Sequence, residues 1–492
     1  QFGVKQRPSF SFRPFSTGEL LASQQAFGMA GGASSNPQAF LPGWYYSPMN
    51  PRWANLSPVE QALEAATLDS IRHINTNWAD QIFRNGNFSN HQISLSGASG
   101  KTRLYSSLGL YNEEGTTLRT DMSRVSLRNN IDFIDDRYTF SINSNFAYTK
   151  RNFQQSSTTN SLGNPFLTQA VAVPYHIVRK PDGTFATGIG SKYAAANQLD
   201  LTSKDKNYNN QIKANIGIVM DYKVTDEIHA GFVTGIDFRE TQNSNYGNRE
   251  AFTRTISSSI TGKAGFQSEG LDRYFQATIR PNIGYHKLIQ NDHDIDVNVY
   301  GEFVDEMGKS LSLTGYGIDP RTPNTPAAIT QGNATNQLYA VVGGGKTENT
   351  IMGGLFNAKY AYKGKYSVTA SLRNDYSSKL PKENRSAFFW SLGGIWDAGK
   401  EEFMKNVDFV DMLRVKASYG SSGNHNNFPG GDYPYQSTYG QGSYSGINTI
   451  EATYPGNPGL KWETTYTLNF GTDFELFNRR LYGDINYYKD RK

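Results

Sequence analysis

The sequence predicts an all-β chain that folds as a transmembrane antiparallel β-barrel, and three observations support this class. Runs in which apolar and polar residues alternate recur along most of the chain. The connections between the runs alternate between short turns and long segments rich in Gly, Ser, Asn and Pro. The 492 residues include 30 Tyr, 29 Phe and 48 Gly, which suits strands joined by turns.

Fourteen strands are predicted, and consecutive strands pair as antiparallel hairpins. Apolar residues occupy every second position, as a strand with one apolar and one polar face requires. The longer runs extend over about 10 to 14 residues, which exceeds the ~5 to 6 of soluble sheets and satisfies the ~9 to 11 of a tilted membrane strand. The predicted strands are 92–96, 104–110, 125–133, 138–148, 212–222, 228–238, 275–285, 295–303, 352–362, 366–372, 386–396, 413–420, 462–474 and 481–487.

The connections predict how the barrel is oriented. Short turns are expected at 97–101, 134–137, 223–227, 286–293, 363–365 and 475–480, with a longer turn at 397–411. Loops are expected at 113–121, 149–207, 240–270, 305–349, 376–385 and 421–459. In bacterial outer-membrane barrels the short turns face the periplasm and the long loops face the exterior. The chain is therefore expected in the cell outer membrane as a multi-pass β-barrel.

Aromatic residues end many of the predicted strands. Outer-membrane barrels carry girdles of aromatic side chains at both membrane interfaces. We therefore expect a girdle that includes Tyr148, Tyr222, Tyr285, Tyr300, Tyr362, Trp396 and Tyr488.

The first ninety residues have a different pattern. Residues 57–66 (SPVEQALEAA) predict the start of a helix, with Pro58 just inside it and Glu60 close by. This helix lies in a stretch rich in Gly, Ser, Pro and aromatic residues. We expect residues 1–90 to form a first-strand remnant and an extracellular loop region, and residues 91–492 to form the barrel strands with their long extracellular loops.

Composition excludes several classes of function. The 48 Lys and Arg are nearly balanced by 44 Asp and Glu, without a basic run, so no nucleic-acid partner is expected. The chain has no Cys, which removes thiolate metal sites and thiol nucleophiles. No stretch approaches the ~18 to 20 apolar residues of a membrane helix. The mean hydropathy of −0.58 suits strands that alternate lipid-facing and interior residues. The N-terminus has no signal-peptide pattern, so we expect a processed or incompletely represented chain.

Motifs that could carry chemistry have simpler interpretations. Residues 343–347 (GGGKT) resemble the end of a phosphate-binding loop, but no nucleotide-binding βα unit surrounds them, and a loop is predicted. Asp292, His293, Asp294 and Asp296 could bind a cation, but a polar hairpin turn explains them better. The pair at 113–114 (EE) is interpreted as solvated loop charge. The seven His residues have no metal spacing. No catalytic, cofactor or metal residue is predicted, and the chain is not expected to be an enzyme.

Aromatic residues in the loops are the candidate contacts for a ligand, because a ring offers apolar area together with a polar group. They could stack on a sugar or a peptide, but packing between loops or against a lid protein is the simpler interpretation. The residues that contact substrate are left unassigned. The loop aromatics concerned are Trp44, Tyr45, Tyr46, Trp53, Tyr175, Tyr433 and Tyr435.

Several sequence stretches resemble the SusC/RagA family of TonB-dependent outer-membrane transporters, in the order in which that family has them. The resemblance covers about residue 75 to the C-terminus. It rests on residues 77–84 (NWADQIFR), 90–97 (NHQISLSG), 105–109, 111–115 (YNEEG), 372–379 (LRNDYSSK), 401–404 (EEFM), 413–420 (LRVKASYG), 423–424 and 457–465 (NPGLKWETT).

The resemblance implies active import. The family has a barrel of about 22 strands around an N-terminal plug, with a SusD-like surface lipoprotein over the extracellular mouth. TonB pulls on the plug to admit an oligosaccharide or peptide. The resemblance also implies a dimer of such pairs, contact with outer-membrane lipid and no cofactor. Fourteen strands cannot close that barrel, and we find neither a plug nor a TonB box, so we expect an incomplete barrel.

Two alternatives stay open at this point, because fold does not dictate function. A barrel of this family could serve as a structural or scaffold subunit of a larger outer-membrane complex, with transport lost. It could also act as a passive porin, which would conduct steadily where a plugged transporter would be almost silent.

Overall fold

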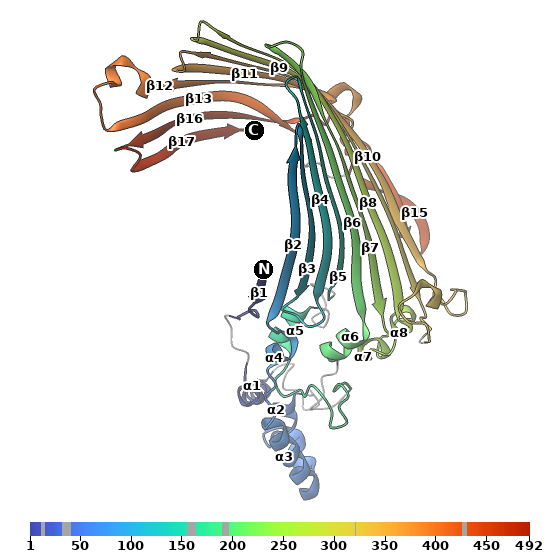
Figure 1. The fold of residues 1–492 in the computed structure, drawn as a ribbon. Helices are drawn as coiled ribbons and strands as arrows, with labels where there is room; N and C mark the ends of the chain where they lie inside the picture. Colours follow the sequence, from blue (N-terminus) through green and yellow to red (C-terminus); the bar gives the residue numbers. More distant parts are fainter. Residues whose placement is uncertain (11–14, 32–40, 155–163, 189–195, 320, 426–430) are drawn as a thin grey trace.

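The computed structural model describes residues 1–492 except 11–14, 32–40, 155–163, 189–195, 320 and 426–430. One antiparallel sheet of 15 strands dominates the fold, and a separate two-stranded hairpin stands beside it (Figure 1). The strands are β1 (Phe2–Lys5), β2 (Gly86–Ser99), β3 (Thr102–Glu114), β4 (Asp121–Ile134), β5 (Tyr138–Asn152), β6 (Lys206–Lys223), β7 (Ile228–Gly247), β8 (Phe266–Ile289), β9 (His293–Tyr316), β10 (Val341–Tyr362), β11 (Tyr366–Ser377), β12 (Ser386–Asp397), β13 (Val410–Asn424), β14 (Thr438–Tyr444), β15 (Ile447–Tyr454), β16 (Glu463–Leu476) and β17 (Leu481–Arg491).

The strand order follows the sequence. Each strand of the large sheet pairs with its sequence neighbour, except that β16 lies beside β13 because β14 and β15 pair only with each other. All fourteen predicted strands are present, and the fifteenth is β1, which pairs with β2 through four residues. The sheet curves into an open wall with β1 at one edge and β17 at the other.

The structure corrects the predicted strand ends and one loop. β8 and β9 each contain 24 residues, and β10 contains 22. The predicted loops 240–270 and 305–349 are therefore shorter than expected, and the prediction of a single irregular loop at 421–459 is wrong because β14 and β15 lie within it. Apart from residues 310–314 (SLSLT), these extra segments have no clear apolar alternation, so their strands depend on backbone pairing with a neighbour.

The short turns form one rim of the sheet, which we call the short-turn rim, and the long loops form the opposite loop rim. Gln290 and Asn291 join β8 to β9 with φ values of 53° and 59°. Lys363 and Gly364 join β10 to β11 with φ values of 52° and 61°. Two consecutive positive φ values define the tight turn whose twist matches a β-hairpin, and Asn and Gly adopt them most readily.

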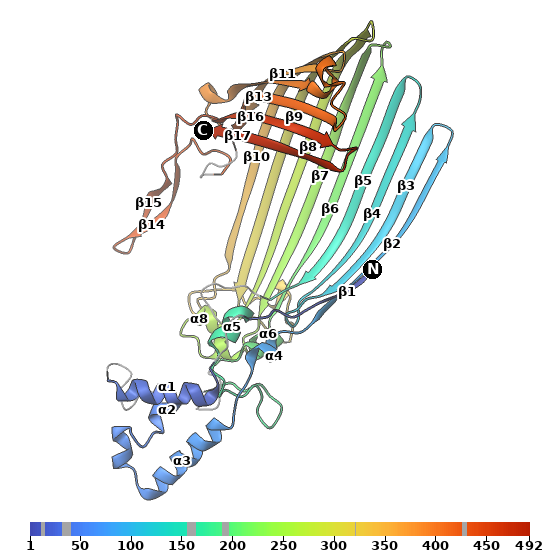
Figure 2. The same cartoon turned by 90° about the vertical axis from the view of Figure 1, so that its left-hand side faces the viewer.

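Short helices gather at the loop rim, and α1 to α3 project beyond it (Figure 2). The predicted helix start is confirmed, because Ser57 caps α3 and the Glu60 side chain returns to the Ser57 backbone N–H. No helix within the described ranges is long and apolar enough to cross a membrane. The helices are α1 (Thr17–Met29), α2 (Pro42–Tyr45), α3 (Pro58–Arg72), α4 (Trp78–Ile82), α5 (Pro165–Val171), α6 (Gln198–Lys204), α7 (Phe252–Thr255) and α8 (Ile260–Ala264).

Candidate functional site

The sheet has a polar inner face and an apolar outer face. Residues that pair across neighbouring strands share a face, and the face alternates along each strand. A hollow of about 630 Å³ lies on the face that carries Gln92, Arg128, Asn145 and Asp237, so this face is the concave, inner one. The opposite face, which we call the outer face, carries an apolar row in which each residue pairs with the next across β2 to β7: Ile93, Leu108, Leu127, Phe146, Ala214 and Phe238.

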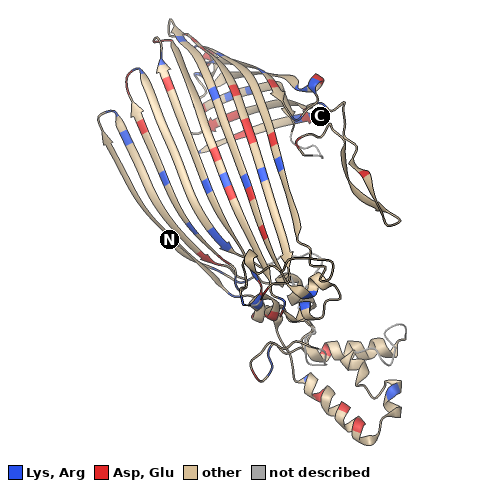
Figure 3. Cartoon of the chain, turned by 90° about the vertical axis from the view of Figure 1, so that its right-hand side faces the viewer, with Lys and Arg blue, Asp and Glu red and all other residues tan. Residues whose placement is uncertain are grey.

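An ion-pair network crosses β8, β9 and β11 on the inner face. Glu302 accepts from Arg280 at 3.2 Å and from Arg373 at 3.2 Å. Arg373 also binds both oxygens of Asp375 at 2.7 Å. Figure 3 shows charged residues of both signs side by side on these central strands. The network holds charged groups of both signs on the interior wall, where a polar ligand or a polar interior domain would meet them.

Further polar contacts continue along the inner face. The Tyr274 hydroxyl lies 3.3 Å from a Glu306 carboxylate oxygen, and the other oxygen accepts from Asn349 at 3.0 Å. On the last strands, the Lys416 ammonium lies 2.5 Å from Asp473. Each contact joins neighbouring strands, so the inner face is a hydrogen-bonded lining as well as a polar one.

The predicted aromatic girdle is confirmed in part. The register places Tyr222, Tyr285, Tyr362 and Trp396 on the outer face at the short-turn rim. Tyr148 lies on the outer face nearer the loop rim. Tyr300 and Tyr488 were assigned wrongly, because they pair with the inner-face residues Asn282 and Asn469. Position along a strand does not identify the face, because neighbouring residues point to opposite sides.

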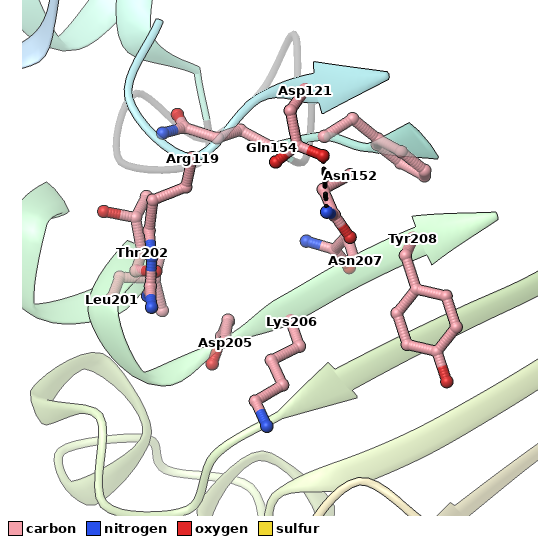
Figure 4. A pocket seen from close by; sticks show the side chains of 11 residues that line it. Arg119, Asp121, Asn152, Gln154, Leu201, Thr202, Asp205, Lys206, Asn207 and Tyr208 are labelled. Carbon is pink, nitrogen blue, oxygen red and sulfur yellow. Dashed lines mark hydrogen bonds between the residues drawn. The ribbon is translucent and has the colours of Figure 1, made fainter. Parts of the chain in front are cut away.

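A pocket of about 390 Å³ lies at the loop rim, where β4, β5 and β6 end (Figure 4). The Asn152 side chain donates to the Asp121 carboxylate at 2.8 Å, and Tyr208 on β6 is paired with Asn152 on β5. Burial raises the pKa of the Asp205 carboxyl, and the ion pair with Arg254 at 2.7 Å opposes that rise. Because Asp121, Asn152 and Tyr208 belong to the outer face, this pocket is separate from the polar inner wall.

The loop aromatics separate into buried and exposed groups. Trp44 is 3% exposed and Tyr175 is 5% exposed, and both are part of the packing between loops. The Arg52 guanidinium lies 3.9 Å from the centre of the Tyr45 ring. Tyr433 is 46% exposed. Trp44 and Tyr175 therefore contribute to loop packing, whereas Tyr433 presents its ring at the surface.

His176 sits where the loop after β5 packs against the segment between α3 and α4. The Thr76 backbone N–H donates to the Pro174 carbonyl at 2.7 Å, and the Thr76 hydroxyl donates to the His176 carbonyl at 2.7 Å. The Trp78 indole donates to the Val173 carbonyl at 3.1 Å. Burial lowers the pKa of His176 to about 4 from its usual 6.5. The packed loop therefore favours the neutral ring.

We predict that acid loosens this loop. Between pH 6.5 and about 4 the exposed ring binds a proton that the packed ring does not, so the stability of the packed form falls as pH falls through this window. At pH 5 the Thr76 amide should exchange about twentyfold faster than at pH 7, after correction for intrinsic exchange. Hydrogen exchange would measure this. His176→Asn should abolish the difference, and a difference that persists in that variant would contradict the assignment.

The motifs weighed in the sequence have clear positions. Residues 343–347 are part of β10, so the prediction of a loop there is wrong. Asp292 ends the β8–β9 turn and Asp294 faces His286 at 2.8 Å, which agrees with a polar hairpin. Glu113 and Glu114 are the last residues of β3, so the interpretation as loop charge is wrong for both, and Glu113 pairs with Lys5. Within the described ranges, no cluster of three or more His, Asp or Glu side chains could hold a metal ion.

Comparison with known proteins gives consistent matches. The family profile described as "TonB dependent receptor-like, beta-barrel" matches residues 285–492. TonB-dependent receptor SusC of Bacteroides thetaiotaomicron is 25% identical over 451 residues, which are 84% of this chain and 42% of SusC. TonB-dependent receptor P3 of Formosa agariphila is 24% identical over 439 residues, which are 84% of this chain and 41% of that receptor.

A solved structure shares the fold. The structure of the RagAB peptide transporter contains a chain that matches 99% of this chain with a TM-score of 0.79 and 20% identity, and the match covers 53% of that chain. The chain spans about two fifths of the length of SusC and of receptor P3.

These matches give the class that the chain resembles: residues 285–492 are similar to the β-barrel of TonB-dependent receptors, and almost the whole chain shares its fold with a chain of the RagAB structure. Within that class its similarity is to SusC and to the RagAB structure, which confirms the resemblance that the sequence motifs predicted.

Proposed function

We propose that this chain forms most of the membrane wall of an outer-membrane importer that is driven by TonB and takes up oligosaccharides or peptides. Residues 1–90 would supply the first strand and an extracellular loop region, and residues 91–492 the barrel strands. A SusD-like lipoprotein would cover the loop rim. The similarity to SusC and to the RagAB peptide transporter supports this assignment.

The separation of the two faces is the observation that carries the proposal. On the outer face of β8, the residues from Phe275 to Tyr285 form an apolar stretch whose length suits a tilted membrane strand. The inner face at the same level holds Arg280 and its ion pairs. A membrane barrel around a polar interior requires this arrangement, because lipid excludes charge and an aqueous interior does not.

The edges of the sheet suggest how the wall is completed. In lipid an unpaired strand edge is costly, because its N–H and C=O groups have no water to bind. Within the described ranges β17 pairs on one side only, with β16, and β1 covers only the first four residues of β2. We propose that further strands close the barrel at these edges and that a plug fills its wide interior.

The experiment that tests the proposal starts from native outer membrane. The protein should be purified with its partners, and intact masses should be measured alongside uptake of labelled oligosaccharides and peptides by intact cells. We expect a parent much heavier than 54.8 kDa, a lipoprotein at about equal stoichiometry, and uptake that is lost when TonB is deleted.

Each alternative function gives a different result. Co-purification with stoichiometric machinery, with uptake unaffected by TonB deletion, would overturn import in favour of a scaffold. Steady conductance in planar bilayers would overturn it in favour of a passive porin. A parent mass near 54.8 kDa would leave no room for a plug and would overturn energised transport.

A further inference from the structure

Three basic residues form a row across β8, β9 and β10 on the outer face. Arg273 lies directly opposite Lys309, and Lys309 lies directly opposite Lys346. We call these three residues the basic row. Side chains at directly opposed positions are close neighbours, and like charges there destabilise a sheet. A bound anion would offset the repulsion between these three cationic side chains.

The protein itself neutralises the row only in part. Glu240 on β7 is paired with Arg273 on β8, and its carboxylate accepts hydrogen bonds from the Arg273 guanidinium at 2.5 and 2.9 Å. The Lys346 ammonium lies 3.9 Å from Glu348, and its side chain is 76% exposed. Lys309 is exposed and makes no hydrogen bond or ion pair with any residue that the structure describes. Lys309 is thus left without a carboxylate partner among the described residues, and Lys346 has only its long, exposed contact with Glu348.

On β8 and β9 the basic row borders the apolar band, whereas on β10 the next outer-face residue is Glu348. One step along the strands towards the short-turn rim, the register pairs Phe275 with Met307 on the outer face. The apolar stretch of β8 thus ends at Phe275, and the next outer-face residue is Arg273. On β7 the same change occurs from Phe238 to Glu240. Figure 3 shows the charged positions of these strands. The row therefore lies where lipid headgroups would begin on the loop side.

We propose that the basic row binds the phosphate of an outer-leaflet membrane lipid whose acyl chains lie along the apolar band. Phosphate accepts charge-assisted hydrogen bonds from Arg and Lys, and its charge would offset the repulsion between the opposed cations. Lys346 belongs to the GGGKT sequence at 343–347. In this proposal that lysine contacts a lipid phosphate, although the sequence does not form a nucleotide-binding loop. This inference rests on the proposed membrane location.

A protein partner is the alternative occupant of this region. Nearer the loop rim, the outer face carries a small apolar patch, in which Leu311 is 52% exposed and Val342 is 68% exposed. A protein docked there would cover that patch. We favour the lipid because Lys309, which has no carboxylate partner in the part of the chain that the structure describes, lies next to the apolar band of β8 and β9. A protein docked on the patch at the loop rim would not need a positive charge at that position.

Native mass spectrometry on the full-length protein in neutral detergent tests the inference. The probes are bisphosphorylated lipid A, the same lipid after dephosphorylation, and inorganic phosphate alone. The double variant Lys309→Gln, Lys346→Gln should bind bisphosphorylated lipid A about thirtyfold more weakly than the wild type, since each basic residue near an anionic surface contributes about fivefold. The dephosphorylated lipid should bind the wild type no better than the variant, and inorganic phosphate should not displace the lipid.

The matched control removes two other lysines from the outer face near the loop rim. Lys150 and Lys206 belong to the outer face of β5 and β6, and their register partners are uncharged. Lys150→Gln, Lys206→Gln should keep the wild-type affinity within about twofold. Equal loss in both double variants, equal binding of the dephosphorylated lipid, or displacement by inorganic phosphate would overturn the inference. If the wild-type protein does not fractionate with the outer membrane, the proposed function fails instead.

Discussion

Replacing Val299 by Arg should destabilise the folded protein in a lipid bilayer by about 2–4 kcal/mol. Val299 is the central residue of the outer-face stretch on β9 and is 46% exposed. Its register partners are Ile283 and Phe356, which offer no counter-ion. A guanidinium at this depth would have to pull water or headgroups into the hydrocarbon. Urea titration of the protein folded into phosphatidylcholine vesicles would measure the change in unfolding free energy.

The neighbouring residue provides the control. Asn298 belongs to the same strand but faces the interior, where it donates to Asp296 at 2.5 Å. Asn298→Arg introduces the same side chain next to a carboxylate and should cost less than about 1 kcal/mol. If the two variants lose the same stability, the two faces meet similar surroundings, and the membrane assignment of the outer face is wrong.

The sequence predicted the strands well because their physics is local. Each of the fourteen strands has one apolar face and one polar face, so the alternation can be read directly from residues such as 212–222 and 228–238. The helix at α3 was equally accessible, since Ser57 and Glu60 form a capping box within four residues. Signals of this kind need no knowledge of distant contacts.

Other features depend on contacts between distant residues. Gly343 to Gly345 have no side chains to alternate, and they are strand only because β9 offers a paired edge. The burial of Trp44 depends on α1 packing beside α2, and that of Tyr175 depends on contact with Leu21 and Ile71. The basic row is set by register across three strands, from residues 36 and 37 positions apart. None of these pairings is visible in a single stretch of sequence.

Removal of the Arg373 side chain should be the most damaging change on the inner face. Arg373 binds Asp375 through two contacts of 2.7 Å and Glu302 at 3.2 Å, and Asp375 is 7% exposed. Arg373→Ala would leave a buried carboxylate without its partner, which costs about 3–5 kcal/mol for a fully buried pair. Because the Arg373 side chain is itself 31% exposed, we expect about 2–3 kcal/mol, measured by the same urea titration.

Two further variants distinguish this pairing from general damage to the inner wall. Arg280 is 47% exposed and has one contact with Glu302, at 3.2 Å, so Arg280→Ala should cost less than about 1 kcal/mol. Adding Asp375→Asn to Arg373→Ala should recover part of the lost stability, because it removes the stranded charge while keeping the shape of the side chain. Equal losses for the two arginines, without recovery in the double variant, would mean that solvent screens the network. The inner wall would then be held by its backbone ladder alone, and its charges would remain available to whatever fills the interior.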